Sequence, residues 1–160
     1  FMAQKYVKRH GLSLACVRPP VVFGHGRKRG SILWAEAFAS HPALGEAAAL
    51  PFAASSRDVW LYVDDCAEQL IRLALAPRLH HFAYNNGGES VTAAELAALV
   101  RRWLPAARIS FDESVPRTAL IDRMDGRRLA REIEFTPRPL AEGIRAHINE
   151  ARIARGLPLV

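Results

Sequence analysis

Several side chains in this 160-residue sequence have types and positions that could do chemistry. Arg57 carries a planar guanidinium, which can bind a phosphate through two hydrogen bonds and stays charged in proteins. A salt bridge to Asp58 or Asp64 would explain Arg57 equally well. Residues 27–29 (Arg-Lys-Arg) are the densest basic cluster, and we interpret them either as a solvated loop or as an attractor for an anionic substrate.

Two acidic residues have a simpler interpretation than acid–base catalysis. Asp64 and Asp65 precede a helical pattern over residues 66–76, where a carboxylate can accept the free amides of the first turn. Glu68 stands three residues after Asp65, which is the spacing of a capping box. We therefore predict that these carboxylates cap the helix.

The histidine and cysteine positions predict no metal site. His80 and His81 are adjacent, so on a strand they would point to opposite sides and could not readily share one metal. Cys16 and Cys66 are the only cysteines, and their spacing matches no metal or redox motif. We expect two buried thiols in a reducing cytoplasm.

A Pro-Pro turn follows the first expected strand. Residues 14–17 form a short apolar run, which is typical of a strand buried on both faces. Pro19 and Pro20 lack a backbone N–H donor, so the strand must end at or just before them. Ligands of open α/β sheets bind beyond the carboxyl ends of strands. The turn and the loop with Gly24 and Gly26 are therefore expected where a ligand would be met.

The remaining elements alternate between helix and strand. Thr92 and Glu95 have the spacing of a capping box. Alternating elements of this kind indicate an α/β protein with a parallel sheet. Helical patterns cover residues 1–9, 30–40 (ended by His41 and Pro42), 66–76, the stretch between Thr92 and Pro105, 125–132 and 140–155, and strands are expected within 43–56 and at 59–63, 82–84 and 108–111.

Composition excludes several classes of protein. The formal charge is +6, but the basic residues are scattered and do not interleave with aromatic residues on one face, which argues against nucleic-acid binding. No apolar run approaches the ~18–20 residues that span a bilayer, so we expect no membrane partner. No signal-peptide pattern is present, and we expect a cytoplasmic protein.

Four segments, in order, resemble motifs of the extended short-chain dehydrogenase/reductase family, which includes NAD(P)-dependent sugar epimerases and dehydratases. Residues 18–26 (Arg-Pro-Pro-Val-Val-Phe-Gly-His-Gly) are similar to its Arg-Pro-x-x-Val-Tyr-Gly-Pro-Gly segment, and 57–67 to its Arg-Asp-x-x-x-Val-x-Asp-x-Ala signature. Residues 82–88 resemble its Tyr-Asn-x-Gly segment. The stretch 122–144 resembles its closing pattern of Asp, helix, Phe-x-Pro and Leu-x-Glu-Gly helix.

The resemblance implies the C-terminal part of a doubly wound, Rossmann-like parallel-sheet domain plus a small α/β substrate-binding lobe. Residues 1–29 would end the dinucleotide-binding domain, and 30–160 would form mainly the lobe, with 58–90 returning to the sheet. The family's Gly-rich loop and its catalytic Tyr-x-x-x-Lys pair belong to the N-terminal half, which this chain does not contain. We expect the lysine immediately upstream of Phe1. A register that puts it at Lys5 leaves too few residues before Arg18.

The resemblance also implies roles for particular residues. Pro19, Pro20 and Val21 match the turn that approaches the nicotinamide ring of the cofactor, and Val21 would also meet the substrate. Arg57 matches an arginine that contacts the substrate diphosphate, and Arg117 resembles a second phosphate contact. Many sugar-nucleotide relatives carry Asn where Val21 stands, which leaves room for a smaller or less polar alcohol or ketone.

The implied function is hydride transfer with NAD or NADP on a sugar or sugar nucleotide, by epimerase, dehydratase or reductase chemistry. Arg27, in the basic cluster, is a further candidate for substrate binding. A steroid- or ketone-type alcohol oxidoreductase is the alternative within the family, and a non-catalytic remnant that binds a ligand or partner is the alternative outside catalysis. A homodimer is possible, and the chain alone is expected to be inactive.

Overall fold

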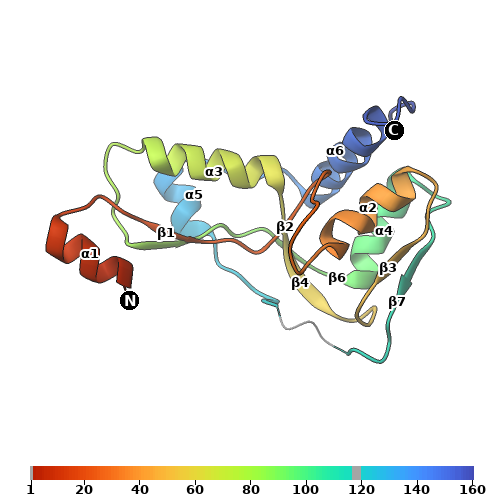
Figure 1. Cartoon of the computed structure of the whole chain (residues 1–160), viewed down its shortest axis with the longest axis horizontal. Coiled ribbons are helices and arrows are strands. Elements are labelled where there is room, and N and C mark those ends of the chain that lie inside the picture. Colours follow the sequence, from red (N-terminus) through yellow and green to blue (C-terminus); the bar gives the residue numbers. More distant parts are fainter. Residues whose placement is uncertain (1, 117–119) are drawn as a thin grey trace.

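The computed structural model describes residues 2–116 and 120–160. The chain is elongated, with α1 at one end, β1 beside α3 and α5 in the middle, and the other helices around short strands at the far end (Figure 1). The helices are α1 (Met2–His10), α2 (Trp34–Ala43), α3 (Val63–Leu75), α4 (Ala93–Trp103), α5 (Arg127–Ile133) and α6 (Leu140–Ile153). The strands are β1 (Cys16–Arg18), β2 (Val21–Phe23), β3 (Ala48–Leu50), β4 (Arg57–Tyr62), β5 (Ala83–Asn85), β6 (Glu89–Thr92) and β7 (Ile109–Phe111).

The strands form three small sheets. β1 pairs with β5 in parallel, and β3 pairs with β7 in parallel. β4 lies between β2, which is parallel to it, and β6, which is antiparallel. The predicted α/β class with parallel pairing is confirmed. Among the described residues, none of the helices is long and apolar enough to cross a membrane.

Most of the buried apolar residues in the described part of the chain belong to one of two clusters. The larger cluster lies where α2, α4 and α6 pack around β2, β3 and β4. Its aromatic centre is Phe23, which contacts Phe38, Trp60 and Tyr62 with ring centroids 5.6–6.0 Å apart. The smaller cluster joins α3, α5 and β5 through four buried side chains, Leu73, Tyr84, Leu129 and Ile133.

Residues around the two prolines depart from the prediction. β1 ends at Arg18, as expected, but its residues are half-buried or exposed, because β5 is its one strand partner among the described residues. The sequence predicts a loop from Pro20 to Gly26. This prediction is wrong for residues 21–23, because they form β2 and pair with β4. The fixed φ of proline is compatible with extended chain, so one polypeptide segment can pass from one sheet to the next.

The helix over residues 34–43 also differs from its prediction. It begins four residues later than the expected start at residue 30 and continues past His41 and Pro42 to Ala43. Pro42 lies in the last turn, where it removes one hydrogen bond, and its ring is buried. The proline therefore shortens the helix little.

The predicted cap of α3 is wrong. The helix begins at Val63, and no side chain caps its first turn. Asp65 is buried and binds Arg138, which lies 73 residues later, with Nε–Oδ distances of 2.9 and 3.0 Å. Glu68 instead pairs with Arg72 one turn further along the helix, at 2.6 Å. A long-range ion pair has replaced the local cap.

Other local predictions are confirmed. The capping box of α4 is present, since the Thr92 hydroxyl accepts from the Glu95 amide at 3.1 Å and Glu95 accepts from the Thr92 amide at 2.7 Å. α1 forms as a helix, but none of its described residues is buried. Cys66 is buried, which raises the pKa of its thiol, whereas Cys16 is only half-buried. The expectation of two buried thiols is therefore half right.

Candidate functional site

The carboxyl ends of β1 and β5 meet side by side. Arg18 and Asn85, the last residues of the two strands, are register partners, and the Asn86 amide donates to the Arg18 carbonyl at 3.2 Å. Pro19 follows one strand end, and a short connection with Gly87 follows the other. This edge is where open α/β sheets bind ligands. A cavity of about 280 Å³ opens here, lined by Arg18, Ala83, Asn85, Asp125 and Arg128.

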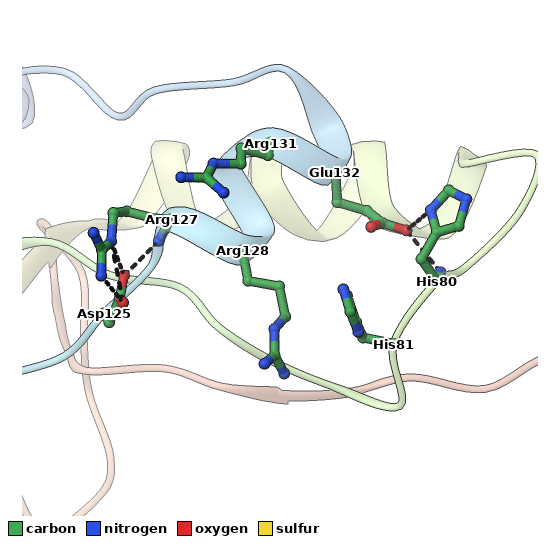
Figure 2. A pocket seen from close by; sticks show the side chains of 7 residues that line it. All are labelled: His80, His81, Asp125, Arg127, Arg128, Arg131 and Glu132. Atoms are coloured by element: carbon green, nitrogen blue, oxygen red, sulfur yellow. Dashed lines mark hydrogen bonds and ion pairs between the residues drawn. The ribbon is translucent and has the colours of Figure 1, made fainter.

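A second, basic cavity of about 480 Å³ adjoins the first, because Asp125 and Arg128 line both. Figure 2 shows Arg127, Arg128 and Arg131 on α5, with His80 and His81 on the loop opposite. Figure 2 also shows Arg127 bonded to Asp125, and the closest contact of the pair, Nη2–Oδ2, is 2.7 Å.

The charges in the basic cavity are only partly balanced. Hydrogen bonds from Arg127 hold the pKa of Asp125 far below its ordinary value. Glu132 accepts from the His80 amide at 2.9 Å and lies 3.0 Å from its Nδ1. Arg128 reaches the Ala83 carbonyl at 3.4 Å, at the limit of a hydrogen bond. Arg128 makes no ion pair with a carboxylate among the described residues, so the cavity can bind an anionic group through this arginine.

The Pro19–Val21 segment, which the sequence predicts as a turn, is extended chain that leads into β2 and presents backbone and ring atoms. Pro19 is exposed and Pro20 is half-buried, whereas the Val21 side chain is buried, with 4% of the residue exposed. Val21 is the register partner of Trp60 on β4. The predicted role of this segment at the nicotinamide ring stays a prediction, and any contact of Val21 with a ligand would be through its backbone.

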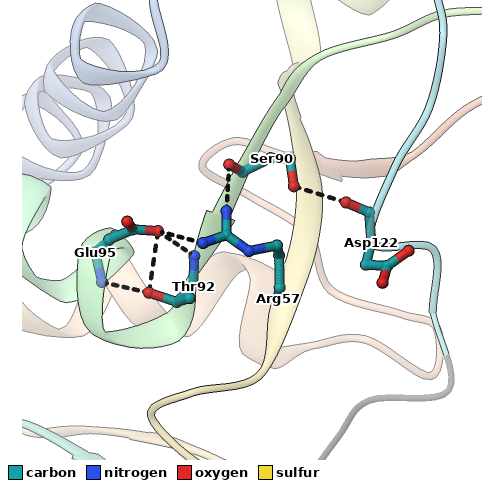
Figure 3. Close-up of polar contacts among 5 residues, drawn as sticks. All are labelled: Arg57, Ser90, Thr92, Glu95 and Asp122. Carbon is teal, nitrogen blue, oxygen red and sulfur yellow. Dashed lines mark hydrogen bonds and ion pairs between the residues drawn. The ribbon is translucent and has the colours of Figure 1, made fainter.

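Arg57 is held at the amino end of β4 (Figure 3). Its Nη1 donates to the Ser90 carbonyl at 2.8 Å, and its Nη2 donates to Glu95 at 3.3 Å. The pKa of Glu95 is lowered, chiefly by hydrogen bonds from Thr92 and also by Arg57. The pair is exposed, so Coulomb attraction stabilises it only weakly. Arg57 keeps a guanidinium edge that a phosphate could share.

Arg57 lies at the amino end of β4, and Pro19 and Pro20 precede the amino end of β2, so all three are at the same end of this parallel pair of strands. Arg57 precedes Trp60, the partner of Val21, by three residues, which is about 10 Å along a strand. Arg27 is anchored elsewhere: its guanidinium donates to the carbonyl of Val22, whose partner Leu61 is about 13 Å along β4 from Arg57.

The second predicted phosphate contact, Arg117, lies outside the described residues. The segment that continues after the gap passes beside Arg57. The Ile121 carbonyl accepts from the Val59 amide at 3.2 Å, and the Ser90 hydroxyl donates to the Asp122 carbonyl at 2.6 Å (Figure 3). Residues 120–122 are therefore fixed against β4 and β6.

The sequence assigns no binding role to the polar residues of the two cavities. His80 and His81 are interpreted there only as unsuited to share a metal, Arg18 and Asn85 lie in motifs, and Asp125 and Arg128 fall in an expected helix. The one local signal was the density of arginines at 127, 128 and 131, which places cations along one short helix. These arginines lie near the strand ends because α5 packs against β5, and no local sequence pattern predicts that packing.

No family model and no curated protein matches the chain. Solved structures do match. An L-threonine 3-dehydrogenase from Trypanosoma brucei has a TM-score of 0.82 at 17% identity, over 99% of this chain and 52% of that one. An L-threonine dehydrogenase from Cupriavidus necator gives 0.80 at 20% identity, over 93% and 51%. A Thermus thermophilus UDP-glucose 4-epimerase in complex with NAD gives 0.74 at 23% identity, over 94% and 50%.

The similarity lies at the level of the fold, because all three identities are below 25%. This chain spans about half the length of the structures that it matches. The four motifs also resemble only the second half of the family's pattern, which agrees with a match to about half of each solved structure. The chain therefore has the α/β fold of about half of the dehydrogenase and epimerase structures that it matches.

Proposed function

We propose that this chain is the C-terminal half of an NAD(P)-dependent enzyme that transfers a hydride to or from a substrate carbon. The supporting observation is the cavity beside the carboxyl ends of β1 and β5, next to the Pro19–Pro20 segment, in a fold whose solved examples include NAD complexes. The nicotinamide would supply the hydride acceptor or donor.

The residues of this chain would form one wall of the cofactor site. The exposed Pro19 ring and the half-buried Pro20 are rigid and apolar, which suits exclusion of water from a site of hydride transfer. The tyrosine acid–base and the lysine that lowers its pKa are expected upstream of Phe1. This chain would contribute binding and orientation.

For the substrate we propose a sugar or sugar nucleotide, with Arg57 as the phosphate contact. The guanidinium is oriented by the Ser90 carbonyl, and its partner Glu95 is exposed. An exposed ion pair contributes only about 0–1 kcal/mol, so a doubly charged diphosphate could replace Glu95 at little cost. Charge-assisted hydrogen bonds to the phosphate would contribute about 1.5–3 kcal/mol.

An alcohol or ketone without a phosphate is the second candidate. The buried, apolar Val21 and the existing Arg57–Glu95 pair favour it, because neither feature requires a charged substrate. Two of the matched structures are dehydrogenases of L-threonine, an amino acid with an alcohol group. The two candidates differ in whether Arg57 touches the substrate.

The experiment begins with NAD(H) and NADP(H) titrations of the protein at its natural length. No binding of either cofactor would refute hydride transfer and favour the non-catalytic alternative. UDP and UDP-glucose are then titrated against wild type and Arg57→Met, with Arg72→Met as the matched control. Arg72 has a similar exposed fraction (43% against 41%) and also pairs with an exposed glutamate.

For a sugar-nucleotide enzyme, Arg57→Met should weaken UDP binding by about 10- to 100-fold, which corresponds to the loss of 1.5–3 kcal/mol. Arg72→Met should bind UDP like wild type, and both variants should keep wild-type affinity for the cofactor. Equal UDP affinity in all three proteins would refute the phosphate contact. Activity on a small alcohol or ketone that Arg57→Met leaves unchanged would then support the second candidate.

A further inference from the structure

Three side chains of types that can ligate a metal lie close together beside the larger apolar cluster, away from the cavities described above. His25 lies in the loop after β2, Glu36 lies on α2 and His147 lies on α6. One ligand atom of each lies within 4.8 Å of the corresponding atoms of the other two. The closest measured pair is His25 Nδ1 and Glu36 Oε1, at 3.4 Å.

Ser40 connects the two imidazoles. Its Oγ lies 3.1 Å from His25 Nδ1 and 2.8 Å from His147 Nε2. Ser40 follows Glu36 by four residues on α2, so both side chains lie on the same face of the helix. α6 packs against this helix and brings His147 to the same place. Residues more than a hundred positions apart therefore share one small polar cluster.

The loop that carries His25 is tightly constrained. A side chain at Gly24 would place its Cβ 2.4 Å from the Val63 Cγ1 atom, so this residue must remain small. Gly26 has φ of +91°, which side chains rarely tolerate. His25, between the two glycines, is positioned by its own contacts: its amide lies 3.4 Å from a Glu150 carboxylate oxygen and its Nδ1 lies 3.1 Å from Ser40 Oγ.

The exposed fraction of the three side chains decreases from His25 through Glu36 to His147. His147 is fully buried, the Glu36 side chain is 17% exposed and the His25 side chain is 31% exposed. The Phe23 ring stacks on His147 at 6.1 Å, and the Phe38 ring meets it edge-on at 5.8 Å. An ion could enter past His25 and reach a site with an apolar inner wall.

His147 has an unsatisfied polar atom at this buried position. Its Nδ1 has no hydrogen-bond partner among the described residues. Burial and the neighbouring His25 lower the pKa of His147 to about 3.

We propose that His25, Glu36 and His147 bind one divalent transition-metal ion, with Zn²⁺ as the best match to the ligands. Two imidazoles and one carboxylate are a ligand set that zinc accepts with a fourth, open position. Bond lengths of about 2.0–2.1 Å place tetrahedral ligand atoms roughly 3.3 Å apart, close to the 3.4 Å between His25 and Glu36. Mg²⁺ and Ca²⁺ are harder cations and prefer oxygen ligands.

Neighbouring groups suit a bound cation. Ser40 Oγ lies 2.8 Å from His147 Nε2, so it would orient this imidazole, the usual support for a ligating histidine, and would leave Nδ1 as the free ring nitrogen. Glu150 lies one turn after His147 on α6, accepts a bond from the Tyr62 hydroxyl and lies 3.4 Å from the His25 amide. Its carboxylate adds negative charge near the cluster. The ion would fasten the loop after β2 and α2 to α6, independently of the proposed hydride transfer.

The test uses the natural-length protein after removal of metal with a chelator. Zn²⁺ is titrated by calorimetry, and Co²⁺ is titrated by visible absorption, which reports four-coordinate ligation. We expect one equivalent of each ion to bind and Zn²⁺ to raise the melting temperature. His25→Ala and Glu36→Gln should each weaken binding by more than about 100-fold, and Ser40→Ala by about 10–100-fold, as for loss of an outer hydrogen bond.

The matched control is His41→Ala, on the same helix as Glu36. His41 is outside the cluster, and its Nδ1 lies 3.3 Å from the Ala47 carbonyl. The proposal requires His41→Ala to bind like wild type. It is overturned if wild type binds neither ion, if His25→Ala or Glu36→Gln retains wild-type affinity, or if His41→Ala loses binding to the same extent.

Discussion

Replacing Arg138 with methionine should destabilise the protein more than any exposed ion pair would suggest. Arg138 Nε donates to both carboxylate oxygens of Asp65, at 2.9 and 3.0 Å. Its guanidinium also lies 4.7 Å from the centre of the Tyr62 ring. The Asp65 side chain is 5% exposed, whereas that of Arg138 is 37% exposed. The methionine would leave a buried carboxylate without its cation.

The magnitude follows from this asymmetry. Removing one partner of a fully buried pair costs about 3–5 kcal/mol, and an exposed pair is worth about 0–1 kcal/mol. Because Arg138 is partly exposed and its backbone amide still faces Asp65 at 3.3 Å, we expect Arg138→Met to lower the free energy of unfolding by about 2–3 kcal/mol. Asp65→Asn keeps an acceptor and should cost only about 1 kcal/mol.

Urea unfolding of the two variants and of Arg72→Met measures the effect. Arg72 has a comparable exposed fraction, but its glutamate partner is 40% exposed, so we expect a loss below about 1 kcal/mol. The reasoning is refuted if Arg138→Met costs no more than Arg72→Met. It is also refuted if Asp65→Asn costs more than Arg138→Met, because the buried charge would then not be the cause.

Three further substitutions test the fold. Gly88→Ala should cost about 1–3 kcal/mol, because φ is +134° and the new Cβ would lie 2.4 Å from the Trp60 carbonyl oxygen; a melting temperature equal to wild type would contradict this. Thr92→Ala removes the cap of α4 and should cost about 1 kcal/mol in urea, whereas Thr92→Ser should cost much less. Ile148→Ala should cost about 2–5 kcal/mol, since this side chain is fully buried; a loss below 1 kcal/mol would show that the core readily collapses around it.

Local signals predicted local structure well. The Thr92–Glu95 capping box depends on residues three apart, and the structure contains both of its hydrogen bonds. The apolar residues of the last helix, Ile144 and Ile148, are fully buried, as their spacing predicts. The overall fold could be predicted because four motifs occur in the same order as in a known family, whereas each motif alone would indicate little.

Long-range partners account for the incorrect predictions. The position of Asp65 at the start of a helical pattern predicts a helix cap, but its carboxylate binds Arg138 instead. No local spacing could reveal a partner 73 residues away. β2 forms after two prolines because β4 offers an edge to pair with. The candidate metal ligands illustrate the same limit: His25, Glu36 and His147 match no spacing motif and meet only when α2 and α6 pack.

The division of the apolar core into two clusters has a consequence for how this chain gains its stability. The smaller cluster contains four buried side chains, so the unit of β1, β5, α3 and α5 removes little apolar surface from water. Ordering a comparable length of chain costs about 1–2 kcal/mol per residue in backbone entropy. This unit should therefore open locally at a lower free energy than the elements around the larger cluster. Its strand ends should become rigid only when a neighbouring surface covers them.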